Sequence, residues 1–156
     1  EAQLDRFLVK IRVGYPGAED ELAMLSAHAR GDDPERGVQE DSSAIAAAQF
    51  DAMREATDRV SVAPDVVSYI SAIVRATRQD PELALGASPR AGVALLRISR
   101  AAAVLAGRDF VTPDDVKGLA PAVLRHRIVL SPELDVEGRT TDDVLAAVLL
   151  RVPAPV

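Results

Sequence analysis

The sequence Ser-Pro-Arg stands in the middle of the chain, where the residues predict the start of a helix. Ser88 suits the N-cap position, and Pro89 suits the first helical position, where its missing N–H costs nothing. Arg90 then adds a positive charge to a first turn that is already partly positive, which costs about 0.3–1 kcal/mol on an exposed helix. Arg90 is therefore a solvated surface residue, a partner of Asp80 or Glu82, or a group that awaits an anion.

A phosphate group would suit this corner of the chain. The free N–H groups and the dipole of a helix N-terminus favour an anion, and a guanidinium has the fork geometry that phosphate oxygens accept. Each charged hydrogen bond is worth about 1.5–3 kcal/mol, which exceeds the dipole penalty. The chain has no Gly-rich phosphate loop ending in Lys-Ser or Lys-Thr and no His-Glu-x-x-His pattern, and its only histidines, His28 and His126, lie far apart. The residues thus leave phosphate binding by Arg90 open beside a solvated or ion-paired arginine, and nothing in them marks catalysis by this chain alone.

The composition limits the possible partners. The 156 residues are enough for one domain with a real core, and the small share of aromatic residues, 3%, favours closely packed helices. The net charge of −6 argues against a general nucleic-acid or anionic-membrane binder. The absence of cysteine excludes thiol catalysis and disulfides. No apolar run approaches the roughly 20 residues that span a bilayer. We expect a cytoplasmic protein with no nucleic-acid and no membrane partner, and, because Glu1 replaces an initiating Met, an excised piece of something longer.

One strand is predicted near the beginning of the chain. Apolar residues alternate with mixed ones over residues 7–13, which is the period of a half-buried strand. A lone strand needs a sheet, and the rest of the chain predicts none, so its partners are expected upstream or in another chain. The sequence Gly-Tyr-Pro-Gly over residues 14–17 then predicts a hinge.

The remainder of the chain is predicted to be helical. Helices are expected over residues 18–31 and 42–57, from Pro64, from Pro89 to about Gly107, from Pro113 after a Thr112 cap, and from residue 141. Pro121 is expected to kink or restart its helix, and residues 78–88 and 128–139 are expected to be irregular. The helical spacing names these buried candidates: Leu22, Leu25, Ala29, Ile45, Phe50, Met53, Val66, Ile70, Ile73, Thr77, Ala91, Leu95, Ile98, Ala102, Leu105, Val144, Leu145, Val148 and Leu149. On the fourth helix, Arg90, Arg97 and Arg108 are predicted to share a face.

Three segments together resemble the C-terminal third of a MoxR-type AAA+ ATPase. They are "EAQLDRFLVKIRVGYPG", "LGASPRAGVALLRISRAAAVLAGRDFVTPDDVK" and "LAPAVLRHRIVL", in the order and at the spacing that this family has. The resemblance covers nearly the whole chain and is weakest over residues 31–58. It implies a mainly α fold, a helical bundle of the AAA+ lid type over residues 14–156. Residues 1–13 would be the end of the ATPase core, with the last strand of its parallel α/β sheet.

The resemblance also implies roles for two arginines. "GASPRA" resembles the second sensor motif, whose arginine reaches the γ-phosphate of ATP bound to the same subunit, and this role would fall to Arg90. "LDRF" resembles the arginine finger, which a subunit offers to the ATP of its neighbour, and this role would fall to Arg6. The alternative for Arg6 is an ion pair with Glu1 or Asp5.

Other marked residues carry weaker implications. Tyr15 and Pro16 stand where the family's linker often lines the adenine pocket, or they are a packed hinge. Arg125, His126 and Arg127 could face a neighbouring subunit or a phosphate, although a helix C-terminus attracts cations anyway. The acidic pairs that follow Pro113 and Thr141 are better explained as helix-start residues than as metal ligands.

By resemblance, the full-length protein would hydrolyse ATP with Mg²⁺ and use the lid motion for chaperone-like remodelling. Its partners would be its own N-terminal ATPase core, further copies in a ring that is commonly hexameric, and proteins with von Willebrand factor A domains. The isolated chain is expected to bind ATP poorly and to hydrolyse none. Two alternatives remain: a helical protein-interaction module without a nucleotide role, and a nucleic-acid-binding face made by Arg90, Arg97, Arg100 and Arg108.

Overall fold

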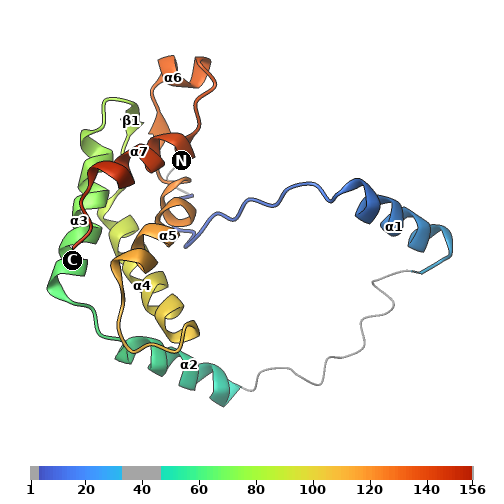
Figure 1. Cartoon of the computed structure of the whole chain (residues 1–156), viewed down its shortest axis with the longest axis horizontal. Coiled ribbons are helices and arrows are strands. Elements are labelled where there is room, and N and C mark those ends of the chain that lie inside the picture. The colour runs from blue at the N-terminus through green and yellow to red at the C-terminus, as the bar shows by residue number, and fades with distance from the viewer. Residues whose placement is uncertain (1–3, 33–46, 156) are drawn as a thin grey trace. The chain divides into compact units, whose positions relative to one another are not determined.

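The computed structural model describes residues 4–32 and 47–155, and seven helices lie within these ranges (Figure 1). The chain forms two compact units, Glu1–Ile11 with Ala52–Val156 and, separately, Arg12–Asp51. Within the described residues, no helix has both the length and the apolar composition that a membrane crossing requires. The expected domain division into residues 1–13 and 14–156 stays a prediction.

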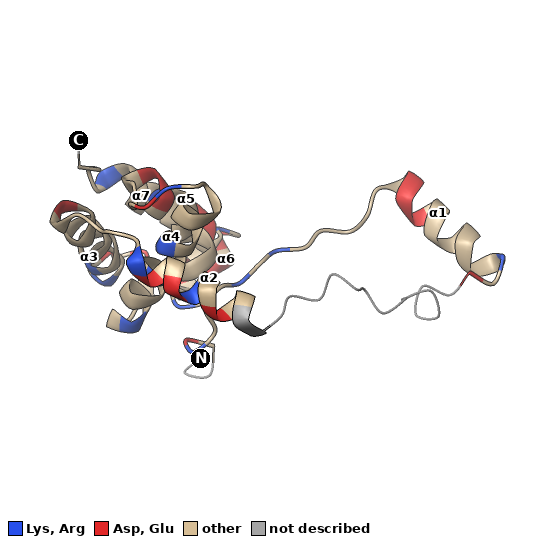
Figure 2. Cartoon of the chain, turned by 90° about the horizontal axis from the view of Figure 1, so that it is seen from below, with Lys and Arg blue, Asp and Glu red and all other residues tan. Residues whose placement is uncertain are grey.

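Helix α1, Ala18–Ala29, belongs to the Arg12–Asp51 unit and confirms the helix predicted there. Its first turn carries Glu19, Asp20 and Glu21, which suit the positive end of a helix and appear red in Figure 2. The predicted burial of its apolar face is wrong, because Leu22 and Leu25 are 67% and 57% exposed. Ala29 is exposed as well. An amphipathic pattern buries a face only where a second element covers it.

The strand expected over residues 7–13 is not formed. Residues 9–17 have no regular secondary structure, and the described part of the chain offers this segment no neighbouring strand. A strand depends on a partner for its backbone hydrogen bonds, so an alternating pattern alone does not produce one. The segment is held to the bundle instead: the Lys10 amide donates to the Ala122 carbonyl at 2.9 Å, and Val9 packs against the core.

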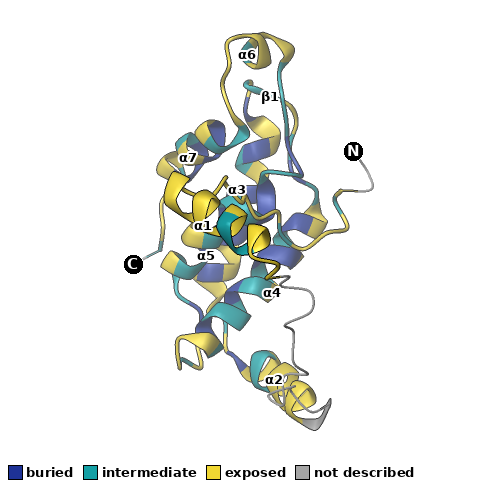
Figure 3. Ribbon diagram, turned by 90° about the vertical axis from the view of Figure 1, so that its right-hand side faces the viewer, coloured by how far each residue is buried: buried dark blue, intermediate teal, exposed yellow. Residues whose placement is uncertain are grey.

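Four helices form the bundle that carries the core, namely α3 (Pro64–Gln79), α4 (Pro89–Leu105), α5 (Pro113–Leu124) and α7 (Thr141–Arg151) (Figures 1 and 3). The predicted buried faces of α3 and α7 are confirmed. The buried positions among these predictions are Val66, Ile70, Ile73, Thr77, Val144, Leu145, Val148 and Leu149. Both helices bury one stripe of residues at helical spacing, and this spacing is visible in the sequence as regularly placed apolar residues.

Helix α4 buries a different set of residues from the predicted stripe. Ala91 and Leu95 are buried as expected, but Leu105 is 89% exposed, and Ile98 and Ala102 are only half-buried. The other buried positions are Ala94, Ser99 and Ala103. Because α4 packs against both α3 and α5, small side chains on two sides are covered, and the helix buries a broader face than one apolar stripe.

Helix α2, Ala47–Arg59, begins later than predicted within the described residues. Phe50 and Met53 were expected to be buried and are 57% and 51% exposed, so this prediction is wrong. Ile45 lies outside the described residues. An isolated parallel bridge between Ser61 and Phe110 follows the helix. Few contacts therefore hold the exposed side of α2 in this chain.

Helix α5 begins with the predicted Thr112 cap. The Thr112 hydroxyl accepts from the Asp115 amide at 3.2 Å, and the Asp115 carboxylate accepts from the Thr112 amide at 2.8 Å, which completes a capping box. The helix continues through Pro121 without restarting. Thr140 and Asp143 form the same box at the start of α7. The acidic residues at both starts thus serve the helix ends, as the sequence indicates.

Two short strands and one short helix lie where irregular structure was predicted. Strand β1, Leu83–Leu85, pairs antiparallel with β2, Val129–Leu130, with Leu83 opposite Leu130. Helix α6, Pro132–Val136, follows β2 at the same end of the bundle (Figures 1 and 3). These elements are too short to show a period in the sequence, so the prediction missed them.

Candidate anion-binding site

A pocket of about 600 Å³ lies between the N-terminal segment and the first half of α4, within the unit Glu1–Ile11 with Ala52–Val156. Four arginines and one aspartate are among its lining residues. The full lining is Asp5, Arg6, Leu8, Arg90, Val93, Ala94, Arg97 and Arg127. The structure therefore brings together the two arginines that the sequence singled out, Arg6 and Arg90.

Arg90 is exposed in the first turn of α4 and has no hydrogen bond or ion pair to any residue that the structure describes. Its two alternative partners are engaged elsewhere. Asp80, buried at the end of α3, pairs with Arg151, and Glu82 lies 3.6 Å from Arg139. Arg90 is thus a cation at a helix N-terminus without a carboxylate partner in the described chain.

The loop before α4 is pressed tightly against the end of α3. A Cβ atom at Gly86 would lie 2.5 Å from the Arg78 Cα and 2.6 Å from the Thr77 carbonyl oxygen, so only glycine fits. The Ala87 amide donates to the Thr77 hydroxyl at 3.0 Å. These contacts set where α4 begins and hence where Arg90 stands.

Ser88 occupies the predicted N-cap position, but its side chain does not cap α4. Its hydroxyl instead donates to the Asp5 carboxylate, at 3.2 and 3.3 Å from the two oxygens. The sequence suggested a local cap because serine at this position usually bonds the amides of its own helix. The tertiary contact replaces that bond and ties the N-terminal segment to the start of α4.

Arg127 is the buried anchor of the pocket, with 2% of its side chain exposed. Its Nε lies 3.2 Å from Asp5 Oδ1, and its terminal nitrogens donate to the carbonyls of Asp5, Phe7, Leu8 and Val123. Burial lowers the pKa of Arg127, the Asp5 carboxylate opposes this, and nearby Arg90 adds to it. Sequence reasoning offered a neighbouring subunit or a phosphate as its partner, whereas the structure uses it to hold residues 5–8.

Its two neighbours in the chain hold the same segment. His126 Nε2 lies 2.9 Å from the Phe7 carbonyl oxygen, and Arg125 donates to the Lys10 carbonyl at 3.2 Å. Arg125 also pairs with Asp142 at 3.1 Å. Three adjacent polar residues after α5 thus hold the N-terminal segment. The one sequence signal for this role was the cluster of polar residues in "LRHR".

Arg6 is exposed on the pocket wall, with its guanidinium 5.6 Å from the centroid of the Phe7 ring. Asp5, one of its alternative partners, is occupied by Ser88 and Arg127. Glu1, the other alternative, lies outside the described residues. Among described residues Arg6 therefore has an aromatic contact and no carboxylate partner.

Arg108 does not share a face with Arg90 and Arg97, which corrects the helical-wheel prediction. The helix ends at Leu105, and Gly107 turns the chain with a φ of 71°. Arg108 then pairs with Asp115, with 2.6 Å between Nη2 and Oδ1. A helical-wheel projection assumes that the helix continues beyond Leu105, so it placed Arg108 on the wrong face. Arg97 does line the pocket.

The charge balance makes the pocket a place for an anion. Asp5 offsets Arg127, and among the residues that the structure describes Arg6, Arg90 and Arg97 have no carboxylate partner on the pocket wall. The pocket fits phosphate oxygens. It does not fit Mg²⁺, because its one carboxylate is already bound, and the described residues contain no cluster of acidic or histidine side chains able to hold a metal.

Tyr15 and Pro16 belong to the other unit, Arg12–Asp51. Both are exposed, and the Tyr15 side chain has full solvent access. Their expected contact with an adenine base stays a prediction.

Comparisons with known proteins agree with the helical fold. Residues 75–148 match the family model of the AAA lid domain. The whole chain is 38% identical over 156 residues to the uncharacterised protein YeaC of Bacillus subtilis, of which it covers 48%. It is 34% identical over 164 residues to the chaperone MoxR1 of Mycobacterium tuberculosis, with 99% of this chain and 42% of that protein covered. The chain thus spans about half the length of these curated relatives.

A solved structure has the same fold. A candidate ATPase from Cytophaga hutchinsonii superposes with a TM-score of 0.82 at 27% sequence identity, and the match covers 99% of this chain and 48% of that one. The bundle and its N-terminal segment therefore recur together in a known protein.

Proposed function

Because the chain belongs to the MoxR-type AAA+ family and carries its AAA lid domain, we propose that this lid senses the terminal phosphate of ATP through Arg90. In the full-length protein, the sensing would drive chaperone-like remodelling of partner proteins. The observation that supports the proposal is the pocket in which Arg6, Arg90 and Arg97 have no carboxylate partner among the described residues. Three such cations on one wall create a positive potential that favours an anion.

The phosphate would act through charged hydrogen bonds to Arg90. Each bond of this kind contributes about 1.5–3 kcal/mol, so the loss of one phosphate group is enough to change the preferred position of the lid. The described lining offers arginines to phosphate oxygens, and its one carboxylate is already bound, so we propose that the remainder of the nucleotide and Mg²⁺ are bound by the N-terminal ATPase core. That core is the first partner of this chain.

Arg6 would assist the same reaction as the arginine finger. Such a group stabilises the charge that develops during phosphoryl transfer, with effects of about 10³–10⁵ on turnover in phosphate-hydrolysing enzymes. Arg6 and Arg90 line one pocket, which favours one phosphate group for both. The family roles would instead assign Arg90 to the ATP of its own subunit and Arg6 to that of the neighbour. A finger that acts on a neighbour requires an assembly, and we propose a homo-oligomeric ring, a hexamer.

Two single substitutions in the full-length protein test the proposal. Arg90→Ala should weaken ATP binding at least about tenfold and leave ADP binding unchanged, because only ATP has the third phosphate. Arg6→Ala should lower kcat by about 10³ with little effect on nucleotide affinity. Arg54→Ala, an exposed change on α2, is the control for lost surface charge. Equal losses of ATP and ADP binding in the Arg90 variant would contradict phosphate sensing.

Mixed assemblies decide which nucleotide each arginine contacts. The Arg6→Ala subunit is mixed with a subunit whose phosphate loop is defective, and recovered turnover indicates action on a neighbour's ATP. The same mixture with Arg90→Ala separates the two assignments, because recovery in both mixtures supports a shared nucleotide across the subunit boundary. Absence of recovery with Arg6→Ala contradicts the finger role in trans.

The wider function follows from this role. We propose a cytoplasmic ATPase that remodels partner proteins with von Willebrand factor A domains. The alternative, a helical interaction module without a nucleotide role, predicts that Arg90→Ala changes partner binding equally with and without ATP. Pull-down of a tagged von Willebrand factor A domain with ATP, with ADP and without nucleotide distinguishes these functions.

A further inference from the structure

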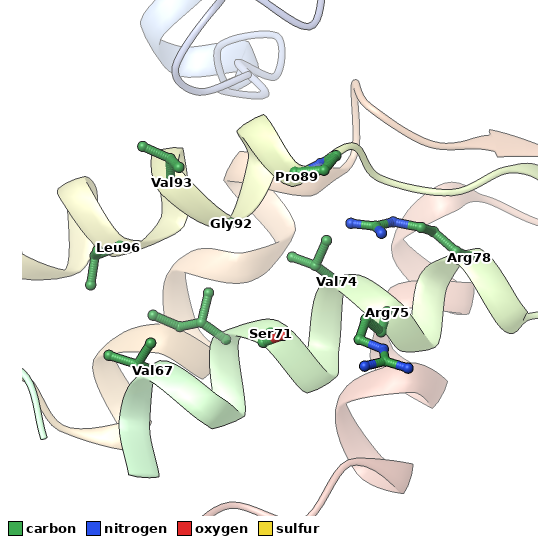
Figure 4. A pocket seen from close by; sticks show the side chains of 10 residues that line it. Val67, Ser71, Val74, Arg75, Arg78, Pro89, Gly92, Val93 and Leu96 are labelled. Carbon is green, nitrogen blue, oxygen red and sulfur yellow. The ribbon is translucent and has the colours of Figure 1, made fainter. Parts of the chain in front are cut away.

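A second groove runs between α3 and α4 and shares the lining residue Val93 with the anion pocket (Figure 4). It has a volume of about 410 Å³ and lies within the bundle unit. Ile70 and Val74 form its buried floor, and Val67 and Val93 stand on its two sides, 46% and 50% exposed. Such a groove has the size and apolar lining of a ligand or peptide site.

Gly92 keeps the floor of this groove open. It lies inside α4, where glycine is a poor helix former. A Cβ atom there would lie 3.7 Å from Val74 Cγ2 and 3.8 Å from Ile70 Cγ2, which is ordinary contact, so close packing does not require glycine. The helix therefore carries an unfavourable residue at a position where its main effect is to leave the groove unfilled.

Two arginines stand at one end of the groove. The Arg78 Nε donates to the Ala87 carbonyl at 2.7 Å, which fixes the side chain, and Figure 4 shows its guanidinium directed over the groove towards Pro89. Arg75, one turn earlier, is exposed, and Figure 4 shows its guanidinium directed away from α4. Neither forms an ion pair with a residue in the described ranges, although the chain as a whole has a net charge of −6. The groove is thus apolar along its length and cationic at one end.

We propose that the α3–α4 groove binds a short acidic segment of a partner protein. An apolar side chain of that segment fills the space above Gly92, and a carboxylate pairs with Arg78. Charge complementarity selects an acidic partner, and the apolar floor selects one that is also hydrophobic. The inference does not depend on nucleotide sensing, because Arg78 and Gly92 do not line the anion pocket, and Val93 is the one lining residue that the two sites share.

The test uses a fluorescein-labelled helical peptide of about twelve residues. This length matches the stretch of α3 that lines the groove, from Val67 to Arg78. It carries leucines one turn apart, followed by a pair of glutamates. Fluorescence anisotropy with the whole chain should show saturable binding that weakens with salt. A peptide with glutamine in place of both glutamates should bind at least about tenfold more weakly.

Variants of the chain locate the binding site. Gly92→Leu fills the groove and should abolish binding, whereas Gly118→Leu makes the same change on α5, where a Cβ atom meets open space, and should not. Arg78→Gln should weaken binding about tenfold, and Arg54→Gln on α2 should not. Circular dichroism verifies that each variant is folded, and Gly92→Ala serves as the milder filling variant if leucine disturbs the bundle.

Three outcomes would overturn the proposal. They are no saturable binding of the glutamate peptide, equal binding of the glutamine peptide, and binding that survives both substitutions at Gly92. Self-association of the chain that Gly92→Leu abolishes, without peptide binding, would instead assign the groove to a second copy.

Discussion

The hydroxyl of Ser88 donates to the carboxylate of Asp5, 83 residues earlier in the chain, at 3.2 Å. Ser88 stands two residues before Arg90, and Asp5 directly precedes Arg6. This bond and the buried Arg127 on the other side of Asp5 fix the two candidate phosphate-binding residues relative to each other. The Asp5 carboxylate therefore links the two, alongside the bonds that Arg127, His126 and Arg125 make to the backbone carbonyls of the N-terminal segment.

We predict that Asp5→Asn destabilises the bundle by about 1–3 kcal/mol. The substitution leaves the Arg127 guanidinium buried without its countercharge, although the carbonyls around it remain. Urea denaturation gives the free energy of unfolding. Ser88→Ala, which removes only the hydroxyl bond, should cost about 1 kcal/mol. An Asp5→Asn variant as stable as the parent would show that the pair does not stabilise the fold.

Gly86→Ala should destabilise the chain by about 1–3 kcal/mol, because its methyl group would meet the backbone of Arg78 and Thr77. The matched control is Gly118→Ala in α5, where nothing lies within 4 Å of the added Cβ atom, and this change should stabilise by about 0.5–1 kcal/mol. Thermal unfolding of both variants tests the prediction. Equal Tm values would indicate that the loop before α4 moves freely.

Stability should fall in acid because of Asp115. The hydrogen bond from Arg108 is the main cause that lowers its pKa from 3.8 to about 2, burial opposes the shift, and Thr112 assists it. A carboxyl with a depressed folded pKa stabilises fully above its unfolded pKa, so this contribution is lost as the pH falls from about 4 to about 2. Asp115→Asn should cost on the order of 1 kcal/mol at neutral pH and remove this part of the pH dependence. Denaturation curves at several pH values measure both effects.

His126 should make the docking of the N-terminal segment sensitive to mild acid. Burial is the main cause that lowers its pKa below 6.5, and the Phe7 carbonyl, Arg127, Lys10 and Asp5 face it. Folding therefore favours the neutral ring. Its contribution to the free energy of unfolding is complete above pH 6.5 and decreases as the pH falls below that value.

An NMR titration of the His126 ring gives its pKa directly, and amide hydrogen exchange at Lys10 reports the docking of the segment. Exchange at Lys10 should accelerate below pH 6.5 relative to the intrinsic rate. His126→Asn should remove this dependence. A His126 pKa above 6.5 in the folded chain would contradict the prediction.

Local signals in the sequence predicted most of the helices. The Thr112 cap with Asp115, and the prolines that open α3 and α4, act through residues within one turn, so a single sequence is enough to find them. The faces of α3 and α7 followed from their regular apolar spacing. The same reasoning failed at Phe50 and Leu105, because an apolar residue is buried only where another element covers it.

The sequence by itself indicated the family resemblance and the helical class and singled out Arg6 and Arg90 as candidates, since residue type and helix starts are local properties. Only the tertiary structure decided that Asp5 binds Ser88 and Arg127, that Arg108 turns away to Asp115, and that Arg6 and Arg90 line one pocket. The contacts of Asp5 join residues more than 80 positions apart. Which distant groups meet depends on how the helices pack, and helix packing depends on shape and burial that no short stretch of sequence contains.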